Sequence, residues 1–130
     1  MTNLETLEAQ HEQALAAGRL TFQRCAGCAH AWLPPREECS RCLGFNLEWE
    51  DASGAAVLVS WCTYHRTPLP AFEDRLPYTV YMVELAEGPR LISGPAQPTG
   101  TTALAVGQRL ELQIQNREGR AVPRFVVLGG

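Results

Sequence analysis

Four of the five cysteines form two Cys-x-x-Cys pairs, Cys25 with Cys28 and Cys39 with Cys42, with ten residues between the pairs. A Cys-x-x-Cys turn brings its two sulfurs toward one point, and two facing turns make the tetrahedral four-sulfur site that zinc prefers. Four thiolates leave no open coordination position, so the site is structural rather than catalytic. The sequence therefore predicts one structural Zn²⁺ ion, with iron as the alternative metal for the same ligands.

Disulfide formation and redox catalysis are the competing uses of these cysteines. Disulfides are disfavoured because no hydrophobic signal segment is evident and Cys62 makes the cysteine number odd, which predicts a reducing, cytoplasmic location. Thioredoxin-like chemistry is disfavoured because a redox pair begins a helix after a strand, whereas these pairs are flanked by Pro and Gly. His30 lies inside the segment, but four cysteines already complete the site, so we do not expect it to be a ligand.

The composition fits one ordinary domain, or a small domain with an appendage, because the chain has 130 residues and is 45% hydrophobic. No run of eighteen apolar residues is present, which predicts no membrane partner. The net charge of −3 provides no general attraction to phosphate polymers or anionic lipid. Composition therefore favours neither a nucleic-acid-binding nor a membrane-bound protein.

Residues 1–20 are predicted to form an amphipathic helix. Thr2 and Glu5 have capping-box spacing at its start, and Gly18 supplies a stop at its end. Apolar residues and one histidine recur at three- and four-residue steps on one face, which either packs on its own domain or docks on another chain. The predicted docking residues, with one tryptophan from the next segment, are Leu4, Leu7, His11, Leu15 and Trp32.

Residues 21–50 hold the cysteine pairs, and residues 51–130 show the period-two pattern of strands. One long strand, a hairpin and two more strands after an irregular connection have the order of an OB-type barrel, with a five-stranded sandwich as the alternative. A barrel is favoured because short strands otherwise leave exposed edges. Cys62, on the long strand, is predicted to be buried or half-buried. The predicted strands are 55–64, 78–85, 90–93, 109–115 and 122–128.

The order of these parts resembles one family, the acyl-CoA-associated proteins that combine a zinc ribbon with an OB fold and were long grouped as a domain of unknown function. The likeness covers nearly the whole chain and includes the N-terminal helix and both cysteine pairs. The motifs that carry it are Pro35-Arg36, Leu47-Glu48-Trp49, Ser53-Gly54, Tyr64-His65, Pro77-Tyr78, Val83-Glu84-Leu85, Glu87-Gly88 and Pro123-x-Phe125.

The resemblance implies a mainly β protein with an N-terminal helix, a rubredoxin-like zinc ribbon and a five-stranded OB-type barrel, with Cys25, Cys28, Cys39 and Cys42 as metal ligands. Family members resemble accessory subunits rather than free-standing enzymes, and they associate with thiolase-fold enzymes or hotdog-fold hydratases. The implied function is that of a non-catalytic subunit in a hetero-oligomer that processes acyl-CoA. This subunit would help to shape the acyl-CoA channel of the enzyme on which it docks. A coenzyme A thioester at the interface is a further expectation.

Two other groups of residues bear on ligands. His65 and Arg66 end the long strand, where an imidazole and a guanidinium at a barrel rim suit an anionic ligand. Single-stranded nucleic acid is the alternative ligand, since both OB barrels and zinc ribbons bind it. It is disfavoured because Tyr78 and Tyr81 are an odd number of residues apart and the barrel segment has equal numbers of acids and arginines.

Overall fold

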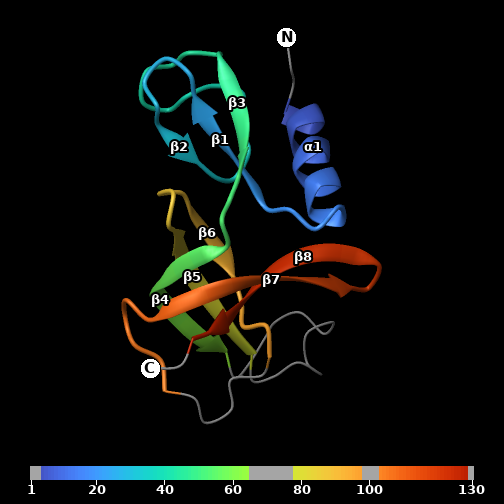
Figure 1. Cartoon of the computed structure of the whole chain (residues 1–130), viewed down its shortest axis with the longest axis vertical. Coiled ribbons are helices and arrows are strands. Elements are labelled where there is room, and N and C mark those ends of the chain that lie inside the picture. The colour runs from blue at the N-terminus through green and yellow to red at the C-terminus, as the bar shows by residue number, and fades with distance from the viewer. Residues whose placement is uncertain (1–3, 65–77, 98–102, 129–130) are drawn as a thin grey trace.

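The computed structural model describes residues 4–64, 78–97 and 103–128 (Figure 1). The described chain is mainly β with one helix, as the sequence predicts. Within these ranges no helix has the length and apolar character needed to cross a membrane. The elements are α1 (Leu4–Ala16), β1 (Thr21–Cys25), β2 (Ala31–Trp32), β3 (Leu47–Asp51), β4 (Ala55–Tyr64), β5 (Tyr78–Leu85), β6 (Arg90–Ser93), β7 (Arg109–Arg117) and β8 (Arg120–Val127).

Helix α1 ends in a Schellman motif built on Gly18, whose φ of 89° suits a residue without Cβ. The Arg19 N–H donates to the Ala14 carbonyl at 2.8 Å, and the Gly18 N–H donates to the Leu15 carbonyl at 2.9 Å. The predicted stop at Gly18 is therefore confirmed. Thr2 of the predicted capping box lies outside the described residues.

The ribbon is a three-stranded antiparallel sheet in the order β2–β1–β3. Gln23 of β1 pairs with Trp32 of β2, and Cys25 at the end of β1 pairs with Leu47 of β3. Four of the five β1 residues are buried, because β1 lies between two strands and also contacts α1. The first cysteine pair thus begins at the end of the best protected strand of this sheet.

The remaining strands form a sheet in the order β6–β5–β4–β7–β8, which curls until its two edges meet. A parallel bridge between Pro95 and Phe125 joins those edges. The Ala96 N–H donates to the Phe125 carbonyl at 2.8 Å, and the Phe125 N–H donates to the Gly94 carbonyl at 3.0 Å. This closure is that of an OB-type barrel and not of a sandwich, which confirms the predicted fold class.

A β-bulge in β4 corrects the prediction for Cys62. Leu58 pairs with Val83 and Ser60 with Met82, so Val59 is an extra residue between them. A one-residue insertion moves every later side chain to the opposite face of a strand. Cys62 therefore points outward and is exposed, although strict alternation from the buried Leu58 would have placed it inside.

One apolar core joins the helix, the ribbon and the barrel. In Figure 1, α1 lies beside the ribbon and above the hairpin of β7 and β8, and it contacts both β1 and β8. An exposed ion pair between Arg120 and Glu12 adds to the contact with β8. The buried residues of this core are Leu15, Leu20, Phe22, Leu33, Ala56, Leu58, Tyr81, Val83, Leu85, Leu110 and Phe125.

Candidate metal centre

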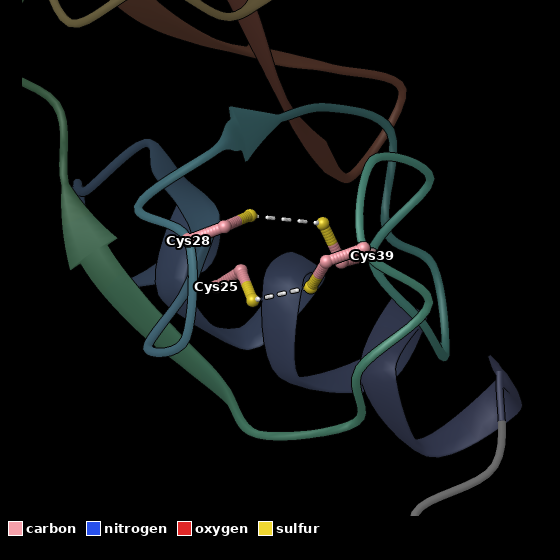
Figure 2. A group of neighbouring side chains, drawn as sticks. Cys25, Cys28 and Cys39 are labelled. Carbon is pink, nitrogen blue, oxygen red and sulfur yellow. Dashed lines mark hydrogen bonds between the residues drawn. The ribbon is translucent and has the colours of Figure 1, made fainter.

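The four predicted cysteine ligands converge at the tip of the ribbon. The two pairs come from opposite loops with their sulfurs directed toward one another (Figure 2). The Sγ atoms of Cys25 and Cys42 are 3.5 Å apart, those of Cys28 and Cys39 are 3.6 Å apart, and all four lie within 4.8 Å of one another. A tetrahedral ion with metal–sulfur bonds of about 2.3 Å requires sulfurs separated by about 3.8 Å. The cluster therefore fits one Zn²⁺ ion.

The two cysteine turns share one backbone design. In each turn, the first cysteine and the residue after the second cysteine make the same two hydrogen bonds. That following residue, Ala29 or Leu43, has a φ of 67° or 62°, which lets the chain reverse tightly around the sulfurs. The bonds join the Cys25 N–H to the His30 carbonyl, the Ala29 N–H to the Cys25 carbonyl, the Cys39 N–H to the Gly44 carbonyl and the Leu43 N–H to the Cys39 carbonyl, all at 2.8–2.9 Å.

The protonation chemistry of the thiols also suits a dication. The Cys28 N–H lowers the pKa of Cys25. Burial raises the pKa of Cys39, but backbone N–H groups of its own turn outweigh burial and lower that pKa to about 7. The Gly44 N–H lowers the pKa of Cys42, whereas the neighbouring thiols raise it to about 12. Four adjacent thiolates repel one another, and a bound Zn²⁺ supplies the charge that stabilises them together.

Gln23 is the buried polar residue that positions the segment between the cysteine pairs. Its side chain is 1% exposed. Its Oε1 accepts hydrogen bonds from Trp32 Nε1 at 2.8 Å and from the Arg36 N–H at 2.6 Å, and its Nε2 donates to the Arg36 carbonyl at 3.0 Å. Gln23 is not among the residues predicted from the sequence. The available signal was Trp32, because a buried indole N–H needs an acceptor.

Both histidines that the structure describes stack on tryptophans. His30 lies over Trp32, with ring centroids 5.5 Å apart, and the four-sulfur cluster is complete without it. The His11 ring stacks on Trp49 at 6.1 Å, and its Nδ1 is buried without a hydrogen-bond partner among the described residues. Burial lowers the pKa of His11, against the raising effects of Glu12 and a hydrogen bond to the backbone of Thr21.

The predicted docking residues divide into buried and accessible groups. Leu7, Leu15 and Trp32 are only 5–6% exposed, because the apolar face of α1 covers its own chain and Trp32 packs beside the cysteines. These three side chains are covered by their own chain, and their part in docking stays a prediction. Leu4, which is 41% exposed, and the half-buried His11 remain predicted docking residues.

The ligand-binding predictions for the barrel are resolved only in part. His65 and Arg66, the candidate anion-binding rim, lie outside the described residues. Tyr81 has its ring fully buried in the core, so it is not a surface on which a nucleic-acid base could stack. Its hydroxyl has no hydrogen-bond partner within the described part of the chain, and burial raises its pKa.

Family models match two consecutive parts of the chain. A model of the ChsH2 rubredoxin-like zinc ribbon domain matches residues 13–48, and a model of the ChsH2 C-terminal OB-fold domain matches residues 49–115. The chain is also similar to a DUF35 domain-containing scaffold protein of Pyrococcus furiosus, with 30% identity over 102 residues, 78% of this chain and 71% of that protein.

A probable enoyl-CoA hydratase alpha subunit of Thermomonospora curvata is 40% identical over 81 residues, 62% of this chain. The chain spans only 25% of the length of that protein. Among solved structures, the chain is similar to one chain of an Ltp2-ChsH2(DUF35) aldolase, with a TM-score of 0.80, 29% identity and 98% of each chain covered. A DUF35 protein of Sulfolobus solfataricus shares the fold, with a TM-score of 0.60, 14% identity, and 80% and 75% of the two chains covered.

Proposed function

This chain belongs to the DUF35 family of ChsH2-type proteins, which combine a rubredoxin-like zinc ribbon with an OB fold, and from that premise we propose that it is a non-catalytic subunit of an acyl-CoA-processing enzyme complex. The observation that carries the proposal is the similarity, over 98% of both chains, to one chain of the Ltp2-ChsH2(DUF35) aldolase, whose name joins two components. The probable enoyl-CoA hydratase alpha subunit is a second relative, and its name is the one that contains acyl-CoA chemistry.

The described residues support a structural role for the chain's own polar groups. The cysteine cluster uses all four positions of a tetrahedral metal, so the bound ion would stabilise the ribbon and leave no position for substrate. His11 is half-buried and stacked on Trp49, and His30 is stacked on Trp32. Neither arrangement places an imidazole beside a nucleophile for acid–base chemistry.

The partner in this proposal is a thiolase-fold enzyme, with a hotdog-fold hydratase as the alternative. The aldolase relative and the hydratase relative motivate these two choices. The subunit would contact the enzyme beside its acyl-CoA channel, with a coenzyme A thioester lying at the interface. The closed barrel and the attached ribbon form one packed body through their shared core, which suits a rigid wall for such a channel.

The test is purification of the tagged full chain from its native cells, followed by identification of attached proteins and assays with acyl-CoA thioesters. We expect an attached thiolase-fold or hotdog-fold enzyme, turnover by the complex, and none by the chain alone. Robust turnover by the pure chain would overturn the non-catalytic assignment. A salt-dependent shift with oligonucleotide, absent with acyl-CoA, would instead favour the nucleic-acid alternative.

A further inference from the structure

The outer face of β4, β5 and β6 carries an unusual apolar surface. We name it the outer stripe and define it as Cys62, Tyr64, Val80, Met82 and Ile92. Ile92 is 69% exposed and Tyr64 is 42% exposed, while Val80 and Met82 are half-buried. An antiparallel sheet with a solvated face normally alternates apolar inward and polar outward, so these exposed apolar residues require an explanation.

Strand register shows that these side chains lie on one face. Tyr81 and Val83 point into the barrel and are fully buried, so Val80 and Met82 point outward. Cys62 pairs with Val80, and Met82 pairs with Ile92, which places those partners on the same outer face. The bulge at Val59 turns Cys62 and Tyr64 outward. The local irregularity of β4 therefore helps to build the stripe.

The opposite wall of the same barrel has the usual polar exterior. On β7, Leu110 and Leu112 face inward, while Glu111, which lies between them, and Gln113, which follows Leu112, are exposed. Across from Gln113, the next strand presents Arg124. This wall also exposes Val126, which pairs with Glu111 and is 37% exposed, but the apolar exterior is larger on β4, β5 and β6, where Ile92 is 69% exposed. That difference marks the wall of β4, β5 and β6 as an interaction surface.

The charges on this wall define the chemistry of the occupant. The charged residues on the described outer faces of β4, β5 and β6 are Glu84 and Arg90, and they pair with each other at 3.0 Å. Such a surface has no unpaired guanidinium for the phosphates of coenzyme A or of a nucleic acid. Since the outside of a barrel is convex, it also does not enclose a small ligand. The matching surface is therefore an uncharged, apolar protein face.

The size of the stripe argues against a dimer held by two stripes alone. Three strands span about 10 Å, and two side chains on one face of a strand are about 7 Å apart. The footprint is thus on the order of 200 Å², whereas a stable interface buries about 800 Å² on each partner. Two stripes pressed face to face would fall well short. The stripe fits the apolar centre of a wider interface.

We infer that the outer stripe is where the catalytic subunit docks, an inference that rests on the function proposed above. The docked enzyme would cover Cys62 and pack against Ile92, the most exposed side chain of the stripe. The interface would then lie on the barrel, while α1 and the metal centre support the fold from the ribbon side. This assigns docking to residues that the sequence analysis did not select.

Cys62 provides a native reporter for the test. The complex purified from native cells would be treated with a maleimide, and the labelling rate of Cys62 measured by mass spectrometry with and without the enzyme attached. A matched reporter is Val106→Cys in a Cys62→Ser background, because Val106 is 74% exposed and lies outside the stripe. We expect at least tenfold slower labelling of Cys62 in the complex and an unchanged rate at position 106.

Two charge insertions test the energetic role of the stripe. Ile92→Glu should weaken binding of the co-purified enzyme at least tenfold, while Val106→Glu, at an equally exposed apolar side chain, should change it less than twofold. Both variants should keep the metal content and strand signal of the parent chain.

Unchanged labelling of Cys62 together with full binding by Ile92→Glu would overturn the stripe as the docking site and leave the proposed function standing. Absence of any acyl-CoA enzyme would overturn both, and concentration-dependent protection of Cys62 in the isolated chain would assign the stripe to a second copy.

Discussion

Replacing Gln23 with methionine should destabilise the ribbon strongly, although the two side chains have similar shapes. Methionine removes the acceptor of Trp32 Nε1–H and of the Arg36 N–H, and it removes the donor to the Arg36 carbonyl. A buried group left without its partner costs about 1–3 kcal/mol. Counting the two orphaned donors, we expect Gln23→Met to lower the free energy of unfolding by about 2–6 kcal/mol, a large share of the stability of a typical domain.

Denaturant unfolding of the metal-loaded full chain measures this loss, and thermal unfolding should show a midpoint lowered by at least about 6 °C. The matched control is Gln113→Met, since Gln113 is an exposed strand residue and its replacement should stay within about 0.5 kcal/mol of the parent. A double-mutant cycle with Trp32→Phe isolates the indole bond. Because the phenylalanine leaves no orphaned indole N–H, the double variant should lose less than the sum of the single losses.

Two results would refute this reasoning about Gln23. Unfolding of Gln23→Met within about 0.5 kcal/mol of the parent chain would mean that the segment rearranges and finds other acceptors at little cost. A large loss of unfolding free energy in which the effects of Gln23→Met and Trp32→Phe simply add would mean that the indole hydrogen bond is not the source of the loss. Faster loss of metal to a chelator in Gln23→Met, but not in the control, would further link the segment to the metal centre.

Metal analysis of protein prepared without added zinc should give one equivalent of metal per chain. The Cys39→Ser variant should lose both the metal and the ribbon structure. Less than half an equivalent of zinc plus iron in a chain whose ribbon is still ordered would contradict the site. Stability should fall as the pH drops below about 6.5, because burial lowers the pKa of His11 and the unfolded chain then binds more protons than the folded one. His11→Gln should reduce this loss of stability at low pH. If the free energy of unfolding of the variant fell just as steeply, His11 would be excluded as the cause. Deleting residues 1–17 should lower the free energy of unfolding by about 3–6 kcal/mol, since Leu7 and Leu15 contribute about 1.5–3 kcal/mol each when buried. A truncated chain as stable as the full chain would disprove that packing role.

The features predicted well from sequence are those that short patterns determine. Strands β5 and β6 begin and end at the predicted residues, because turn-forming residues bound both of them in the sequence. The last hairpin is longer than predicted, with β7 reaching Arg117 and β8 starting at Arg120. Glu118 and Gly119 both have positive φ, as a two-residue hairpin turn requires, and this tight turn permits the longer pairing.

Features that depend on contacts between distant residues were not predictable. Alternation along β4 gives no sign that Val59 is an extra residue, because the bulge is defined by pairing with β5. The choice between self-packing and docking for α1 was equally open, because Leu7 and Leu15 would look the same in either case. Part of the surface that buries the helix comes from β8, more than a hundred residues later in the chain, and the rest includes β1.

The position of β1 links the predicted metal at the tip of the ribbon to the docking surface that we infer on the barrel. One end of this five-residue strand is the predicted metal ligand Cys25. Phe22, within the same strand, belongs to the core shared with Tyr81 and Phe125. Loss of the metal should release the Cys25 end of β1 and thereby loosen Phe22 and the barrel residues packed on it. Chelation should therefore weaken partner binding through the core rather than through a direct contact, and more slowly than it removes the metal.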